Sequence, residues 1–232
     1  MIEYDEFENR MVLKLVYYGP ALSGKTTNLL SLHDILDQEG RGDLTVLDTK
    51  DDRTIFFDLL PFFLTAPSGL KIKLKVFTVP GQVKHDATRK AVLQRADGVA
   101  FIADSQLSEE TNNSESFGNL ENNLEFVGLD IESIPLVIQF NKRDLKDTVS
   151  EENIVRTWGP TGIPVVLSSA IMGQGVVETF SRLVELTYDR IDTKHLLEKN
   201  HGLDKNMFIQ KITGRNLNEA VFKDKRNMTA GY

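Results

Sequence analysis

The 232-residue chain is 41% hydrophobic and 26% charged, the composition of an ordinary globular protein that can bury a sizeable core. It contains no cysteine, which excludes disulfides, thiolate catalysis and cysteine-bound metals and fits a reducing compartment. A net charge of −7 argues against nucleic acid as a partner, and no apolar run approaches the roughly 20 residues of a membrane span. The N-terminus is acidic where a secretory signal would be basic, so we expect a cytoplasmic protein without an integral membrane segment.

Short apolar runs and helical patterns alternate along the chain. The run at 12–18 ends at a glycine and is predicted as a buried strand, followed by a helix at 25–37. A short strand is predicted at 44–47. Residues 70–79 alternate at first between apolar side chains and lysines, which is typical of a strand with one wet face in an antiparallel or edge position.

The second half of the chain continues the alternation. Three runs are apolar throughout and are predicted as parallel strands buried on both faces, at 99–103, 135–140 and 164–167. Helical patterns are predicted at 86–95, 114–126, 150–158 and 176–191. Strands that alternate with helices predict an α/β fold with a mostly parallel central sheet flanked by helices on both faces.

The regular pattern stops near Ile191. Residues 194–232 carry eight Lys or Arg and four Asp or Glu, a basic segment on an acidic chain. We predict a main domain over residues 1–192 and a basic C-terminal extension over 193–232, made of short helices and partly docked. The extension could contact an acidic partner, a membrane surface or the main domain, or it could be solvated.

A phosphate-binding loop is predicted between the first strand and the first helix. Two glycines separated by four residues are followed by Lys25-Thr26. Glycine permits backbone dihedrals at which successive N–H groups point at phosphate oxygens, and the helix N-terminus adds its positive dipole end. Lys25 is expected to reach the β- and γ-phosphates and the Thr26 hydroxyl to bind Mg²⁺. The predicted nucleotide-binding residues of this loop are Gly19, Ala21, Leu22, Ser23, Gly24, Lys25, Thr26 and Thr27.

The segment Asn141-Lys142-Arg143-Asp144 follows the strand at 135–140 and predicts which base is bound. In GTP-binding proteins the carboxylate of this element accepts two hydrogen bonds from guanine, a donor pair that adenine lacks. We expect Asp144 to read the base, Lys142 to pack its stem over it and Asn141 to brace the phosphate loop. Ser169-Ala170 follows the next strand, and its backbone N–H is expected to meet the guanine O6.

A Ras-like protein needs two sensors of the γ-phosphate between these motifs, and the second sensor is predicted at Thr78-Val79-Pro80-Gly81-Gln82. The backbone N–H of Gly81 can reach the γ-phosphate, and Gln82 can orient the attacking water. The first residue of such an element is usually Asp, and here it is Thr78.

The first sensor is predicted within residues 51–58. Thr54 is the candidate ligand of Mg²⁺ and of the γ-phosphate. Arg53 beside it is a candidate arginine finger supplied in cis. A solvated loop arginine is the alternative reading of Arg53.

Together these motifs resemble the MglA family, bacterial Ras-like GTPases that control cell polarity and gliding motility. The resemblance runs from about residue 12 to residue 188, and Thr78 in place of Asp is itself a mark of the family. Its most specific segments are 16–20, 52–58, 60–61, 78–82, 103–106 and 139–145. The resemblance implies a Ras-like P-loop GTPase fold over residues 1–192, GTP or GDP and Mg²⁺ as ligands, and slow GTP hydrolysis.

The resemblance also implies how hydrolysis is stimulated. Arg53 would be the intrinsic finger and Gln82 the water-positioning residue. Both would move into place when a homodimeric, roadblock-fold activating protein of the MglB kind binds. The chain itself would be a monomer, with further effectors that the sequence does not identify.

Two departures from the family pattern bear on activity. The family usually has glycine where this chain has Ala21, and a side chain there crowds the incoming Gln and Arg. We hypothesise that Ala21 slows hydrolysis and leaves GTP binding intact. The second sensor continues with Lys84-His85 where the family commonly has aromatic residues, which affects the standard partner contacts.

Two other functions compete with a hydrolysing switch. A GTP-dependent scaffold that does not hydrolyse is favoured by Ala21 and Thr78 and disfavoured by Arg53 and Gln82. A P-loop ATPase or small-molecule kinase is disfavoured by the guanine-type segment at 141–144.

Overall fold

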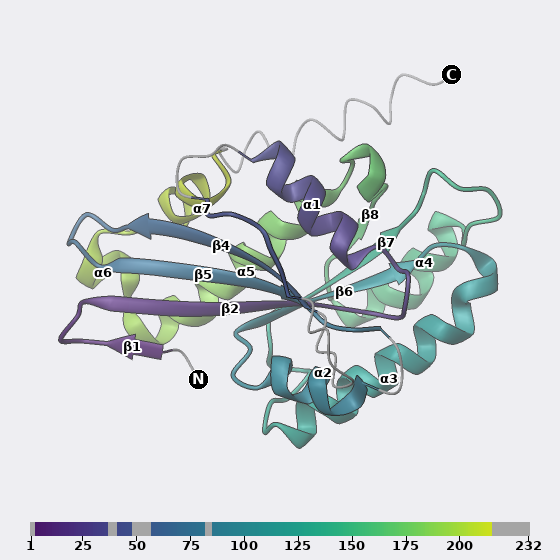
Figure 1. Ribbon diagram of the computed structural model, residues 1–232, viewed down its shortest axis with the longest axis horizontal. Helices are drawn as coiled ribbons and strands as arrows, with labels where there is room; N and C mark the ends of the chain where they lie inside the picture. The colour runs from purple at the N-terminus through teal and green to yellow at the C-terminus, as the bar shows by residue number, and fades with distance from the viewer. Residues whose placement is uncertain (1–2, 37–40, 48–56, 82–84, 215–232) are drawn as a thin grey trace.

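The computed structural model describes residues 3–36, 41–47, 57–81 and 85–214. An eight-stranded sheet crosses the molecule in the order β3-β4-β5-β2-β6-β7-β8, with β1 beside the first half of β2 (Figure 1). The strands are β1 Glu3–Asp5, β2 Arg10–Tyr18, β3 Thr45–Leu47, β4 Phe57–Thr65, β5 Lys71–Thr78, β6 Gly98–Asp104, β7 Leu136–Asn141 and β8 Val165–Leu167. The pairs from β5 through β2, β6 and β7 to β8 are parallel, whereas β1, β3 and β4 pair antiparallel. The predicted α/β fold with a mostly parallel sheet is confirmed.

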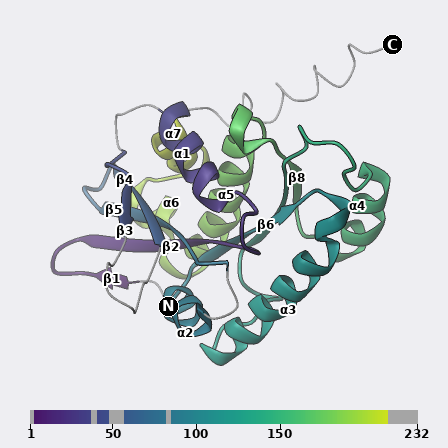
Figure 2. The ribbon, with the colours of Figure 1, turned by 45° about the vertical axis from the view of Figure 1, so that its right-hand side comes forward.

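Helices lie on both faces of the sheet. They are α1 Lys25–Ile35, α2 Asp86–Leu93, α3 Glu110–Phe126, α4 Glu151–Trp158, α5 Val176–His195, α6 Leu197–His201 and α7 Lys205–Thr213, with single 3-10 turns at Leu107–Glu109, Gly159–Thr161 and Ala170–Met172. Figure 2 shows α1, α5 and α7 grouped on one side and α3 running along the other. Within the described residues, no helix is both long and apolar enough to span a membrane.

Each face of the sheet has its own hydrophobic core. Leu13 and Leu74 face the core under α1, α5 and α7, which includes Phe180 of α5. Phe101 and Ile138 face the core under α2, α3 and α4. All residues of β6 and β7 are buried, as expected for parallel strands that helices cover on both sides.

β5 has the predicted wet face and the first of its two predicted positions, because it pairs antiparallel with β4; it pairs parallel with β2 on its other side, so it lies inside the sheet and not at an edge. β4 was not predicted from the sequence, because its residues FDLLPFFLT do not alternate and Pro61 is unusual inside a central strand. The Pro61 carbonyl accepts a hydrogen bond from the Gly42 N–H at 2.8 Å, so the backbone of Pro61 faces away from β5 and its missing N–H breaks no bond between β4 and β5.

The described part of the C-terminal segment packs on the main core. α5 runs four residues past the predicted end, to His195, and α7 lies against α5 and β4. Phe208 is fully buried, with its ring centroid 5.3 Å from that of Tyr188. The Tyr188 hydroxyl donates a hydrogen bond of 2.7 Å to the Leu203 carbonyl. The division into domains at residue 192 stays a prediction, and residues 215–232 lie outside the described part.

Candidate functional site

The predicted phosphate loop connects β2 to α1 at the carboxyl end of the parallel strands. Gly19 has φ of +146° and Gly24 has φ of +96°, a region that residues with a side chain rarely adopt. A Cβ on Gly19 would lie 2.2 Å from the Ile102 carbonyl oxygen, and one on Gly24 would lie 2.2 Å from Asn141 Nδ2. The loop therefore needs glycine both for its backbone conformation and for its close packing on β6 and β7.

Lys25 is the buried cation of this loop. Its side chain lies in the first turn of α1, and Nζ donates to the carbonyl oxygens of Gly19 at 2.9 Å and Pro20 at 2.6 Å. Burial is the main cause that lowers the pKa of Lys25 from 10.5 to about 7; the positive charge of Arg89 lowers it further, and Asp58 opposes this. An anion placed against this ammonium group would restore the charged form.

Three oxygen-bearing side chains meet beside Lys25. The Thr26 hydroxyl donates to Asp58 Oδ2 at 2.6 Å, and the Thr78 hydroxyl donates to the same oxygen at 3.0 Å. The Asp58 N–H in turn donates to the Thr78 hydroxyl at 2.8 Å. Thr26 comes from α1, Asp58 from β4 and Thr78 from β5, and Asp58 is only 5% exposed.

This cluster has the chemistry of a magnesium site, because Mg²⁺ prefers hard oxygen ligands such as hydroxyl and carboxylate groups. Asp58 supplies a carboxylate next to Thr78, where the element at 78–82 lacks its usual Asp. Asp58 was not predicted as a site residue from the sequence. Thr78, which stands where such elements usually have Asp, could have indicated it, because a carboxylate missing from one strand can come from the adjacent strand.

The base-reading segment is joined to the phosphate loop by Asn141 at the end of β7. Asn141 Nδ2 donates to the Ser23 carbonyl oxygen at 2.8 Å, and Asn141 Oδ1 accepts from the Ala170 N–H at 2.9 Å. The Ser169 hydroxyl donates to Asp144 Oδ1 at 2.5 Å. One side chain thus holds together the phosphate loop, the end of β7 and the turn after β8.

Lys142 lies across the same end of the sheet. It has φ of +66°, and its Nζ forms an ion pair of 2.5 Å with Asp104 Oδ2 at the end of β6. The Asp104 backbone is held by Asn113 of α3, which accepts from its N–H at 3.0 Å and donates to its carbonyl at 2.8 Å. The ion pair therefore fixes Lys142 relative to β6 and α3.

Gly81 brings the second predicted sensor against the phosphate loop. A Cβ on Gly81 would lie 2.3 Å from the Ala21 amide nitrogen, so only glycine permits this approach. Ala21 and Leu22 are exposed on the loop. The predicted residues Gln82, Arg53 and Thr54 lie outside the described residues, as does Lys84.

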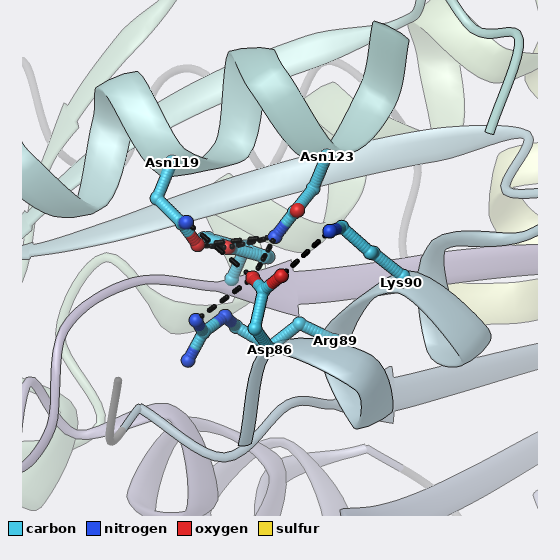
Figure 3. A network of polar contacts seen from close by, with 6 residues as sticks. Asp86, Arg89, Lys90, Asn119 and Asn123 are labelled. Atoms are coloured by element: carbon cyan, nitrogen blue, oxygen red, sulfur yellow. Dashed lines mark hydrogen bonds and ion pairs between the residues drawn. The ribbon is translucent and has the colours of Figure 1, made fainter. Parts of the chain in front are cut away.

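The helix that follows the second sensor is tied to its neighbours by Asp86 (Figure 3). The Asp86 carboxylate accepts from Arg89 at 3.0 Å, Lys90 at 2.7 Å and Asn123 of α3 at 3.0 Å. The hydrogen bond from Lys90 is the main cause that lowers the pKa of Asp86, and Asn123 and Arg89 act in the same direction. The first turn of α2 is thereby pinned to α3.

The same network reaches the strand that leads into the phosphate loop. The Tyr18 hydroxyl donates to Asn119 Oδ1 at 2.5 Å and accepts from Asn123 Nδ2 at 3.1 Å. Tyr18 immediately precedes Gly19. Arg89, whose side chain is 5% exposed, lies close enough to Lys25 and Tyr18 for its charge to affect both. The sequence analysis did not predict this network, because its members are separated in the chain and belong to no motif.

The structure thus gathers at one end of the sheet the described site residues Gly19, Ala21, Leu22, Ser23, Gly24, Lys25, Thr26, Thr27, Gly81, Asn141, Lys142, Asp144, Ser169 and Ala170. Crevices at the carboxyl ends of parallel strands are where open α/β sheets bind their ligands.

The chain is similar to known proteins. The ADP-ribosylation factor (Arf) family profile matches residues 64–187. The mutual gliding-motility protein MglA of Myxococcus xanthus (strain DK1622) is 44% identical over 173 residues, which cover 75% of this chain and 89% of that protein. Such a family implies a guanine nucleotide and Mg²⁺ as ligands, and the oxygen cluster and glycine loop described above fit both. By the extent of these two matches, the chain belongs to the MglA family of small GTPases.

Proposed function

We propose that this chain is a molecular switch that binds GTP and GDP, hydrolyses GTP slowly and acts in cell polarity or gliding motility. The hydrogen bond from Asn141 to the Ser23 carbonyl carries the proposal, because it joins the base-reading segment to the phosphate loop at 2.8 Å. A nucleotide that fills the loop therefore meets Asp144 at its base. The motility role is taken from the name of the Myxococcus relative.

Guanine selectivity would come from Asp144. One of its oxygens accepts from the Ser169 hydroxyl, which orients the carboxylate. An adenine in this position would leave the carboxylate without its donor pair, and a site that loses such hydrogen bonds can discriminate by about 10⁴-fold or more. The Lys142 stem, held by Asp104, would lie against the base.

Thr26 and Asp58 would hold Mg²⁺, together with Thr54 of the first sensor. When bound, Mg²⁺ neutralises charge on the β- and γ-phosphates. Asp58 would take the place of the carboxylate that Thr78 lacks, and the Thr78 hydroxyl would orient it. Lys25 would contribute the second positive charge against the phosphates.

Hydrolysis would use Gln82 to orient the water and Arg53 to stabilise the transition state, as in other GTPases with an arginine supplied in cis. The unstimulated rate would be slow, of the order of 10⁻⁴ s⁻¹. The close approach of Gly81 to the Ala21 backbone supports crowding by the Ala21 side chain as one reason for a slow rate.

We propose activation by a homodimeric, roadblock-fold protein of the MglB kind that brings Arg53 and Gln82 into place. The chain would act in the cytoplasm as a monomer. Lys84-His85 would alter the contacts of the second sensor with that activator, because a lysine and a histidine stand where the family commonly has aromatic residues.

The competing function is a GTP-dependent scaffold that does not hydrolyse. Ala21 favours it, but the Asp58 carboxylate beside Thr78 weakens the argument that Thr78 alone disables the metal site.

The experiment is GTP turnover by the purified chain, alone and with a roadblock-type protein from the same genome. We expect slow turnover that the partner raises, a rise that Arg53→Ala and Gln82→Ala abolish, and faster turnover by Ala21→Gly than by the wild type. Tight GTP binding without turnover in either condition would instead establish the scaffold.

A further inference from the structure

One half of the sheet has a face that no helix of the described residues covers. In Figure 1, β4, β5, β2 and β1 are seen unobstructed, with α5 behind them. Alternate residues of these strands point into the core under α5, so the residues between them point to the open face. We name this open surface the basic sheet face, and its residues are Arg10, Val12, Lys14, Pro61, Phe63, Lys71, Lys73, Lys75 and Phe77.

Cations of the basic sheet face stand directly opposite one another. In the parallel register of β2 and β5, Arg10 pairs with Lys71, and Lys14 pairs with Lys75. Like charges in opposed positions destabilise a sheet. Burial lowers the pKa of Lys14, and the charge of Lys75 is the second cause. The β2-β5 pair therefore contains two repulsive cross-strand pairs of basic residues, although the chain as a whole has a net charge of −7.

These cations have few anionic partners within the protein. Among the described residues, no ion pair reaches Lys71, Lys73 or Lys75. Within the same part of the chain, Arg10 forms an ion pair with Glu8 alone, at 3.2 Å, and both side chains are about half exposed. Lys14 donates to the Gln94 carbonyl at 3.1 Å, which is a neutral acceptor. The positive charge on this face is therefore available to an external anion.

The face has an acidic border on one side and an apolar border on the other. Glu3 and Asp5 of β1 lie in register with Val12 and Arg10. On the other side, Phe63 of β4 is 46% exposed and lies under the Lys73 ammonium group, with 5.1 Å from Nζ to the ring centroid. Between these borders the basic side chains lie on only two strands, β2 and β5, and form a narrow cationic stripe.

A hollow opens at the end of the stripe nearest the nucleotide site. Its volume is about 180 Å³, and its walls include Lys14, Lys75, Arg95, Phe77, Glu3 and Asp97. The hollow is lined by three basic side chains and two carboxylates, so basic groups are in excess, and Phe77 adds an apolar wall. The hollow can admit one acidic side chain.

We propose that the basic sheet face binds an extended, acidic segment of a partner protein in which acidic and apolar residues are mixed. Lysines on alternate residues of β5 are about 6.6 Å apart, the spacing of alternate side chains in an extended peptide. Carboxylates of such a segment would face the lysines, and apolar side chains would pack on Phe63. A planar anionic membrane fits less well, because Glu3 and Asp5 border the stripe and would repel it.

This proposal does not depend on GTP hydrolysis, although β5 leads directly into the switch element at 78–81. The test uses fluorescence anisotropy of a short fluorescein-labelled peptide in which glutamate alternates with valine, added to the full chain loaded with GDP. We expect binding that weakens as salt rises. The double variant Lys73→Glu/Lys75→Glu should weaken it by about tenfold or more, since two favourable charge pairs become repulsive.

The matched control is Lys199→Glu/Lys211→Glu, which changes the net charge equally at exposed positions of α6 and α7 and should leave the peptide affinity unchanged. Unchanged GDP affinity shows that each variant is folded. If the charge reversal prevents folding, Lys73→Gln/Lys75→Gln replaces it, with a smaller loss expected. Three results would overturn the proposal: no peptide binding by the wild type, equal loss in the control variant, or binding only to vesicles of phosphatidylserine and phosphatidylcholine.

Discussion

Nucleotide binding should take up a proton at Lys25. The side chain is 8% exposed, and burial lowers its pKa to about 7, so at pH 8 only about one tenth of the free protein carries this charge. Phosphates beside Nζ favour the charged form and should raise the pKa well above 8. Binding of Mg²⁺·GDP at pH 8 should therefore take up about 0.9 proton.

The sign of the pH dependence follows from the same shift. Because the charged form binds phosphate and becomes scarcer in the free protein above pH 7, affinity is highest below pH 7 and falls as pH rises. From pH 8 to pH 9 the fall should be about tenfold, or about 1.4 kcal/mol. This window avoids the phosphate groups, whose own second pKa is about 6.

Isothermal titration calorimetry at pH 8, in buffers of different ionisation enthalpy, measures the proton uptake directly. Lys25→Gln is the control, which should bind more weakly and take up no proton from this position. An uptake near zero in the wild type, with affinity flat between pH 8 and 9, would show that Lys25 is already charged in the free protein.

Three further changes test other parts of the structure. Asp58→Ala should lower the apparent Mg²⁺ affinity by about 10- to 100-fold, because it removes a carboxylate of the proposed site, and GDP release at limiting Mg²⁺ measures this. Asp86→Ala should lower the free energy of unfolding by about 1–2 kcal/mol in urea, since it removes an ion pair to buried Arg89 and a hydrogen bond from Asn123 of α3, while Asp86 itself is partly exposed; no change would mean that the network does not hold α2. Phe208→Ala should cost about 3–5 kcal/mol, whereas Phe7→Ala, at a fully exposed position, should cost less than about 0.5 kcal/mol; equal costs would contradict the docking of α7 on the core.

The local sequence was sufficient to predict the parts of the site that directly follow a strand. The phosphate loop and the segment at 141–144 each follow an apolar run, so their place at the carboxyl end of the sheet could be expected. The parallel strands β6 and β7 could also be predicted from the sequence, because burial on both faces leaves a continuous apolar pattern.

Contacts between distant segments could not be predicted in this way. Asp58 reaches Thr26 only because β4 pairs with β5, and the pattern of β4 is obscured by Pro61. The Asp86 network joins α2, α3 and β2 through ordinary polar residues. The packing of Phe208 also depends on where a polar segment folds back, which periodicity does not determine.

The most direct test of the account is competition between nucleotides for the site formed by the phosphate loop and Asp144. Displacement of a fluorescent GDP analogue from the wild-type chain should require an ATP concentration about 10⁴-fold or more higher than the GTP concentration that has the same effect. Asp144→Asn should lose this preference while Lys25 still binds the phosphates. Equal displacement by ATP and GTP in the wild type would contradict a guanine-reading site and with it the proposed switch.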